Sequence, residues 1–138
     1  VSLSGPDNVE AREWYEANQM PVFAYSSLAR GFFSGRITRQ NFQEMRATLD
    51  RACLKAYCHE VNFRRLDRVM TLVEETGATV PQLALAYSLR APLNVYPIVG
   101  AANGDEFRSN LKAFDIALTA KERDWLDLET DNRKYLVR

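Results

Sequence analysis

The sequence contains few of the residues that build disulfide frameworks or metal sites. Its 138 residues include two cysteines and one histidine. Cys53 and Cys58, with His59 beside the second, form C-x4-C-H, which lacks the paired ligand spacing of a structural zinc site. We therefore expect reduced thiols without a structural role, as in a cytosolic protein, and no metal ligands. His59 is expected to be a surface or loop residue.

The chain also has no excess of charge and no long hydrophobic run. Eighteen Lys and Arg balance eighteen Asp and Glu, so no net charge favours nucleic acid or an anionic membrane. The longest apolar runs are far shorter than the ~20 residues that span a bilayer. No signal-peptide pattern opens the chain. These absences predict a cytoplasmic protein that binds neither nucleic acid nor membrane.

What is present fits one modest α/β domain. We find no internal repeat and no linker, and treat residues 1–138 as one segment with a polar tail at 129–138. Because the first residue is Val1 rather than methionine, we interpret the chain as a cut or processed piece. Two short apolar runs, "VFAY" at 22–25 and "NVYPIVG" at 94–100, predict strands buried on both faces of a parallel sheet.

Helical patterns surround these strands. Asp7 and Glu10 have the spacing of a capping box, and Thr119 and Glu122 repeat it. The stretch 27–61 is irregular and long for a plain connection, although Thr38 is a candidate cap for a helix reaching Leu49. The order of helices and strands predicts an α/β fold with parallel strands. The expected helices cover 7–18, 63–76, 82–91, 104–114 and, after the box at Thr119 and Glu122, 123–129.

Both predicted strands end in turns that contain glycine, where parallel α/β folds bind ligands. Ser26, Ser27 and the amides through Gly31 are candidate donors to a phosphate, with Arg30 adding charge. Tyr25 is placed to present its ring to a planar ligand. The alternatives stay open at this point: the glycines serve only the turns, and Tyr25 is a core residue with a satisfied hydroxyl.

Three segments in order resemble the aldo-keto reductase family over about residues 8–128. "FAYSSLARGFFSG" is similar to the segment A-Y-S-P-L-x-x-G-x-L-x-G that ends the seventh barrel strand. "NFRRLDRVMTLVEETGATVPQLALAYSL" resembles the helical region that follows, and "VYPIVGAANGDEFRSNLKAFDIALTAKERDWL" resembles the eighth strand and last helix. The resemblance implies the C-terminal portion of a (β/α)8 barrel, incomplete as a barrel, with about two parallel strands and several helices.

The family uses NADP or NAD to reduce carbonyl groups, and the resemblance implies roles in cofactor binding. Tyr25 would stack under the nicotinamide, the following turn would wrap the pyrophosphate, and the Gly100 turn would line the adenosine-phosphate end. Glu106 and Asn110 would face adenosine. The full candidate set is Tyr25, Ser26, Ser27, Leu28, Arg30, Gly31, Gly100, Ala101, Ala102, Asn103, Glu106 and Asn110.

Two departures from the family pattern bear on this expectation. Ser27 stands where the family has proline. The turn after Val99 has no lysine or arginine for a 2′-phosphate, and Glu106 lies close by. A charged hydrogen bond to that phosphate contributes about 1.5–3 kcal/mol, so we expect the preference to drift toward NADH.

The chain lacks the family's catalytic tyrosine, lysine, aspartate and histidine, which belong to the first half of the barrel. Lys55, Tyr57 and His59 do not fit the required order, so we predict no catalytic residue and an inactive isolated chain. Two strands also leave unpaired edges, which predicts self-association or pairing with a missing N-terminal half, through residues 36–61 and the helix 82–91. The alternatives are a non-catalytic oligomerisation or interaction module, and a regulatory subunit that binds cofactor without turnover.

Overall fold

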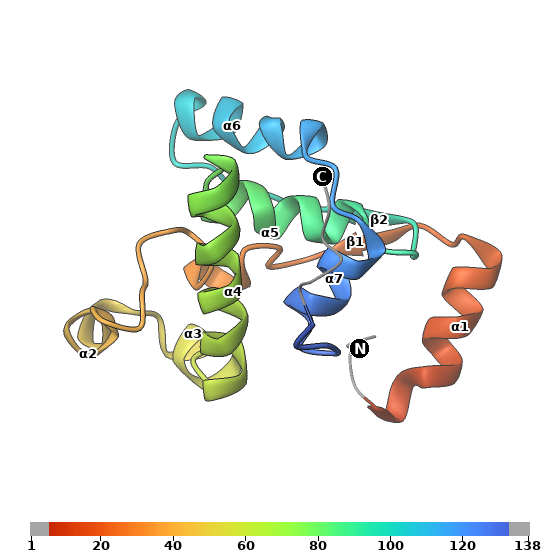
Figure 1. Ribbon diagram of the computed structural model, residues 1–138, viewed down its shortest axis with the longest axis horizontal. Coiled ribbons are helices and arrows are strands. Elements are labelled where there is room, and N and C mark those ends of the chain that lie inside the picture. The colour runs from red at the N-terminus through yellow and green to blue at the C-terminus, as the bar shows by residue number, and fades with distance from the viewer. Residues whose placement is uncertain (1–5, 133–138) are drawn as a thin grey trace.

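Two short parallel strands lie against a layer of helices in the computed structural model, which describes residues 6–132 (Figure 1). The elements along the chain are η1 Pro6–Asn8, α1 Val9–Asn18, β1 Val22–Ala24, η2 Ala29–Gly31, α2 Phe42–Met45, η3 Arg46–Thr48, α3 Arg51–Ala56, α4 Glu60–Thr76, α5 Val80–Leu89, β2 Val95–Pro97, α6 Gly104–Leu111, η4 Lys112–Asp115 and α7 Ala120–Leu126. This order confirms the predicted mixed α/β fold. The six residues 133–138 of the predicted tail lie outside the described part.

β1 and β2 pair in parallel, with Val22 opposite Val95 and Ala24 opposite Pro97. The prediction that both faces are buried is wrong. Phe23 is 70% exposed on the face that no helix covers, because side chains alternate along a strand and the helices pack on the other face. The sequence could not distinguish a strand covered twice from one whose second apolar face is open.

Threonine side chains cap two of the helix starts. Thr119 caps α7 in the capping box with Glu122 that the spacing predicts, and Thr79 forms a second box with Gln82 at the start of α5. α4 ends at Gly77, whose φ of 70° is a conformation that glycine adopts without steric cost. The box predicted from Asp7 is wrong, because α1 begins after η1 and its N-cap residue makes no side-chain capping bond.

The long segment between β1 and α4 contains more helix than the sequence indicated. The predicted helix up to Leu49 is divided into α2 and η3, and its N-cap position is Asn41. The pattern missed α3, whose start is capped by the Asp50 carboxylate, which accepts a hydrogen bond from the Ala52 amide. In Figure 1, α3 lies beside the first turns of α4, and α2 lies farther to the left.

The core forms between α4, α5, α7 and the segment after β1. Its buried residues are Ala29, Phe32, Ile37, Cys53, Phe63, Leu66, Val69, Leu72, Val80, Leu83, Trp125 and Leu126. The residues of α5 are buried on several sides, including Leu85 and Ala86, which pack in a smaller cluster with Ala113 of η4. These side chains are covered by the helix's own chain, and the expected association through this helix stays a prediction.

α1 stands apart from this core, at the opposite side of Figure 1 from α2. None of its residues is buried. It is held at its end, where the Asn94 amide donates to the Gln19 carbonyl at 2.9 Å. Among residues 6–132, no helix has the length and apolarity needed to cross a membrane.

Candidate functional site

The two turns that follow the strands leave the sheet at the same edge. The parallel register of β1 and β2 requires this, since their carboxyl ends coincide at Ala24 and Pro97. Beyond the last pair, the Ile98 amide donates to the Ala24 carbonyl at 2.9 Å. The expected convergence of the Tyr25 turn and the Gly100 turn is therefore present, at the edge where α/β folds place their ligands.

A groove of about 960 Å³ lies at this edge. We call residues 34–36 its first wall, residues 77–81 before and within the start of α5 its floor, and residues 100–102 with Glu106, Ser109 and Asn110 of α6 its second wall. Met70 and Val73 of α4 also line the groove. Gly35 has φ 83° and lies close to the Pro81 ring, so a side chain there would be strained at the point where the wall meets the floor. The groove is large enough for a nucleotide-sized ligand.

The turn after β1 is strained and largely satisfies its own amides. Ser26, Ala29 and Arg30 have positive φ values of 57°, 51° and 53°, each costing on the order of 1–3 kcal/mol. The amides of Ala29 and Gly31 donate to the carbonyls of Ser26 and Leu28. Those two amides already have acceptors, and strain of this kind in a non-glycine turn is typical of functional sites.

Two arginines follow β1 in this region: Arg30 is paired with a carboxylate, and Arg36 is paired with none among the described residues. Arg30 donates from Nε to the Asp50 carboxylate at 2.6 Å, and this hydrogen bond raises the pKa of Arg30 above its usual value. Arg36 lines the groove instead. Its described side-chain contact is with the Ser34 hydroxyl, 3.4 Å from Nε, and no carboxylate among the described residues pairs with it. The sequence signal was available, because Arg36 directly follows the second loop glycine.

A carboxylate fixes the turn before α6. The Asn103 side chain accepts a hydrogen bond from the Glu106 amide at 2.9 Å and caps the helix. The Glu106 carboxylate in turn accepts from the Ala102 amide at 2.8 Å. The positive end of α6 therefore already faces a negative charge, and this end of the groove is acidic.

Asn110 is the buried polar residue in the groove wall. It is 6% exposed, and its Nδ2 has no hydrogen-bond partner among the described residues. Burying an amide donor without an acceptor costs about 1–3 kcal/mol. The arrangement is typical of a group whose acceptor is a ligand.

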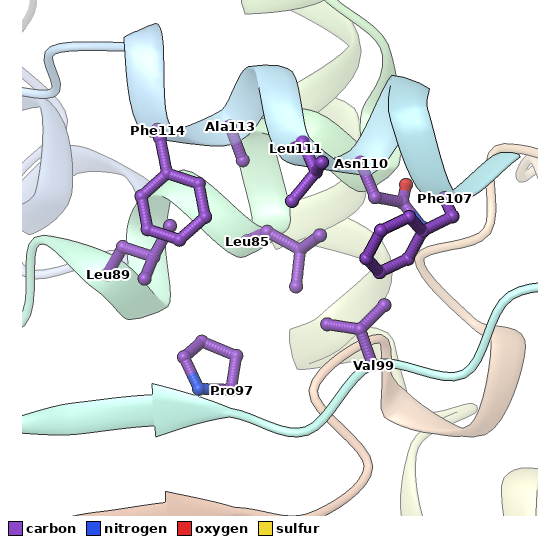
Figure 2. A pocket seen from close by; sticks show the side chains of 9 residues that line it. All are labelled: Leu85, Leu89, Pro97, Val99, Phe107, Asn110, Leu111, Ala113 and Phe114. Atoms are coloured by element: carbon purple, nitrogen blue, oxygen red, sulfur yellow. The ribbon is translucent and has the colours of Figure 1, made fainter. Parts of the chain in front are cut away.

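Asn110 also borders a second cavity of about 300 Å³, between β2 and the helices α5 and α6. Figure 2 shows its amide beside the Phe107 ring, with Leu85 and Val99 across the cavity. Phe107, Leu111 and Phe114, which the sequence aligns on one side of α6 and η4, are exposed rather than buried in the core. Because the lining is apolar apart from Asn110, this cavity offers binding surface rather than acid–base groups.

The Tyr25 ring lies on the open face of the sheet and is 76% exposed. Phe23 and Tyr96 share that face, with ring centroids 5.5 Å apart. The alternative that Tyr25 is a core residue is therefore wrong. Its predicted contact with a nicotinamide ring stays a prediction.

A third cavity, of about 610 Å³, lies on the other side of the turn and contains tyrosine and histidine. The Tyr87 hydroxyl donates to the Asp127 carboxylate, and burial followed by this bond raises the pKa of Tyr87 above its usual value. That makes Tyr87 a weaker acid. His59 is exposed, with Nε2 2.7 Å from the Lys55 carbonyl oxygen. This set does not match a proton donor activated by a neighbouring cation.

The predicted site residues divide between these places. Gly100, Ala101, Ala102, Glu106 and Asn110 line the groove, whereas Asn103 caps α6 behind it. Ser26 and Ser27 line the third cavity, and Leu28 packs against the smaller core cluster. Gly31 shapes the strained turn. The sequence reasoning missed Arg36 and the floor at 77–81.

A sequence profile described as the aldo/keto reductase family matches residues 7–127. The match covers most of the chain, so the protein belongs to the aldo/keto reductase family. The two parallel strands with their helices are the part of a (β/α)8 barrel that this membership requires.

Individual relatives agree with the family assignment. The chain is 32% identical over 130 residues to the uncharacterized oxidoreductase Rv2298 of Mycobacterium tuberculosis. This alignment covers 91% of this chain and 38% of the relative. It is 29% identical over 101 residues to a probable aldo-keto reductase 1 of Glycine max, covering 73% and 29% of the two chains. The uncharacterized oxidoreductase YrpG of Bacillus subtilis is 29% identical over 97 residues, covering 70% and 28%. The chain thus spans about two fifths or less of the length of these relatives.

Proposed function

We propose that this chain contributes the nucleotide-holding part of an NAD(P)H-dependent carbonyl reductase, with the groove at the carboxyl edge of the sheet as its binding site. The observation that carries the proposal is the buried, unpaired Nδ2 of Asn110 in the groove wall. A dinucleotide offers ring nitrogens and hydroxyls as acceptors for this donor. Arg36 supplies positive charge for phosphate from the opposite wall.

The proposal assigns the reacting end of the dinucleotide to the exposed Tyr25 ring. Tyr25 lies at the carboxyl end of β1 on the open face of the sheet. An aromatic stack contributes about 0.5–1.5 kcal/mol beyond buried area, so Tyr25 orients a nicotinamide more than it anchors it. When bound in the whole protein, reduced nicotinamide supplies a hydride for a carbonyl carbon. We expect no turnover by this chain alone, since Tyr87 and His59 are not arranged as an acid and its activator.

Glu106 favours NADH over NADPH in this proposal. Its carboxylate is fixed by the Ala102 amide at the α6 terminus, where it can accept hydrogen bonds from ribose hydroxyls. The same charge repels a 2′-phosphate, and no described cation lines that wall of the groove. Arg108 is engaged by Asp105. Loss of a charged hydrogen bond of about 1.5–3 kcal/mol corresponds to roughly 10- to 150-fold in affinity.

A second candidate function is an oligomerisation or interaction module. The specific observation is the open apolar face of the sheet, where Phe23, Tyr25 and Tyr96 are exposed with Ile98 beside them. Contiguous exposed apolar residues of this kind mark interaction surfaces. The face would meet either a second copy or the remaining part of the barrel.

Titration of the chain with NADH and NADPH, by calorimetry and by Trp fluorescence, tests the first function. We expect saturable binding with NADH tighter, and Glu106→Gln should narrow the difference between the two cofactors by about tenfold. Absence of binding by both cofactors, together with a concentration-dependent dimer in sedimentation, would favour the interaction module. Equal effects of Glu106→Gln on both cofactors would contradict the assigned role of this carboxylate.

A further inference from the structure

The side chain of Ser27 joins the ends of the two strands. Its Oγ lies 2.8 Å from the Ala24 carbonyl oxygen and 3.1 Å from the Ile98 carbonyl oxygen. The regular ladder has ended by this point, because the last paired residues are Ala24 and Pro97. A single hydroxyl therefore contacts two carbonyls: that of Ala24, the last residue of β1, and that of Ile98, which directly follows β2.

The backbone of the preceding residue makes this contact possible. Ser26 has a φ of 57°, which reverses the chain direction and returns Ser27 toward the strand that it has just left. The Ala24 carbonyl accepts from the Ser27 hydroxyl and from the Ile98 amide, which is 2.9 Å away. The strained conformation and the hydroxyl contact thus belong to one local arrangement.

The consequence concerns the distance between the two turns. The groove walls grow from these strand ends, one through residues 34–36 and the other through Gly100 to Ala102. β1 and β2 have three residues each, so few ladder bonds fix their relative position. An added contact at the carboxyl edge therefore has more effect here than it would in a long sheet.

We propose that Ser27 is a positioning residue: its hydroxyl holds the two turns in register at the carboxyl edge and does not itself contact a bound phosphate. The single hydroxyl proton is shared between the Ala24 and Ile98 carbonyl oxygens, so the side chain is unavailable as a donor to a ligand. The functional part of this inference rests on the proposed dinucleotide site. The structural part, which concerns the turns alone, does not.

The test compares Ser27→Ala, Ser27→Thr and the control Ser88→Ala. Ser88 carries a hydroxyl whose bond to the Ala84 carbonyl stays inside α5, so its removal should leave the edge unchanged. Amide hydrogen exchange is measured by NMR at Ile98, at the carboxyl edge, and at Val22, whose amide bonds to the Asn94 carbonyl at the other edge. We expect Ser27→Ala to speed amide exchange at Ile98 about three- to tenfold and to leave exchange at Val22 and the Tm nearly unchanged. Ser27→Thr, which keeps the hydroxyl, should restore the protection of the Ile98 amide.

NADH affinity gives the functional readout. If the unaltered chain binds NADH, Ser27→Ala should weaken that binding about three- to tenfold, and Ser27→Thr should restore it. An NADH affinity that is unchanged in Ser27→Ala overturns the positioning role. If the unaltered chain binds no dinucleotide, the proposed function fails and exchange at Ile98 alone decides whether the hydroxyl ties the turns together. Equal acceleration at Ile98 and Val22, or no acceleration at either, overturns the inference. If Ser27→Ala does not fold, Ser27→Cys, with its weak donor, gives the same readouts.

Discussion

Replacing Asn110 by leucine should make the protein more stable and weaken dinucleotide binding. The buried Nδ2 of Asn110 has no acceptor among the described residues, and an unsatisfied buried amide costs about 1–3 kcal/mol. Leucine has nearly the same shape, and the apolar cavity of Figure 2 lies beside it, lined by Leu85, Val99 and Phe107. We expect the free energy of unfolding to rise by about 1–2 kcal/mol, or Tm by roughly 4–8 °C.

Asn62 provides the matched control. Its Nδ2 donates to the Tyr57 carbonyl at 2.9 Å, and its Oδ1 accepts from Arg65 at 2.9 Å. Asn62→Leu removes the satisfied amide and leaves its partners unpaired, so it should lower stability by about 1–3 kcal/mol. Two Asn→Leu substitutions in one chain should therefore have opposite signs.

Urea unfolding at fixed pH measures the two free energies, and NADH titration of the same proteins measures binding. If Asn110→Leu lowers stability by more than about 1 kcal/mol, the amide has an acceptor and the physical reason for assigning it to a ligand is lost. If stability rises while NADH affinity is unchanged, the amide is orphaned but does not serve the dinucleotide. The expected pattern, higher stability with weaker binding, is that of a residue kept for function.

Three further outcomes follow from local contacts. Arg36→Met should weaken the binding of NADH and of NADPH about tenfold. The control Arg30→Met breaks the pair with Asp50 outside the groove and should leave both affinities, measured by calorimetry, unchanged. Equal losses in the two variants would contradict the assignment of Arg36 as the cation of the groove. Gly77→Ala should lower Tm by roughly 4 °C. The added Cβ meets no neighbouring atom, but Gly77 has a φ of 70°, and this left-handed conformation costs alanine about 1 kcal/mol. An unchanged Tm would refute the strain argument. The Arg39 guanidinium, by hydrogen bonding, holds the pKa of Glu60 below its ordinary 4.5. The stability that this bond contributes is present above pH 4.5 and is lost as the pH falls through the lowered pKa of Glu60. Arg39→Met should therefore reduce the fall in the free energy of unfolding between about pH 6 and about pH 3. The same pH dependence in both proteins would exclude a contribution of this pair.

The predictions that succeeded depend on local spacing. Thr119 with Glu122 forms its predicted capping box because both partners lie within one turn, so neighbouring residues contain the whole interaction. The expected helix 63–76 ends where predicted, because Gly77 adopts the left-handed conformation at its C-cap. The parallel pairing of the strands was also predictable, since the intervening helices leave room for a crossover and the apolar runs are too short for helices.

What the sequence left open depends on contacts between distant residues. An apolar α5 gave no sign of whether its own chain or a partner covers it, and the fold buries it internally. Arg30 and Arg36 look equivalent in a loop rich in glycine. Asp50, twenty residues away in the sequence, pairs with the first and leaves the second at the groove.

The sequence by itself determined the family, the two strands with the longer helices around them, and the two turns that leave one edge of the sheet, because these follow from motifs and periodicities of neighbouring residues. Only the tertiary structure decided which groups in those turns remain available to a ligand. The Ala102 amide is used by Glu106, the Ser27 hydroxyl by the Ala24 and Ile98 carbonyls, and the Asn110 amide by no described residue. The reason is physical: a hydrogen bond depends on positions within about 3 Å, and those positions are set by packing across the whole chain.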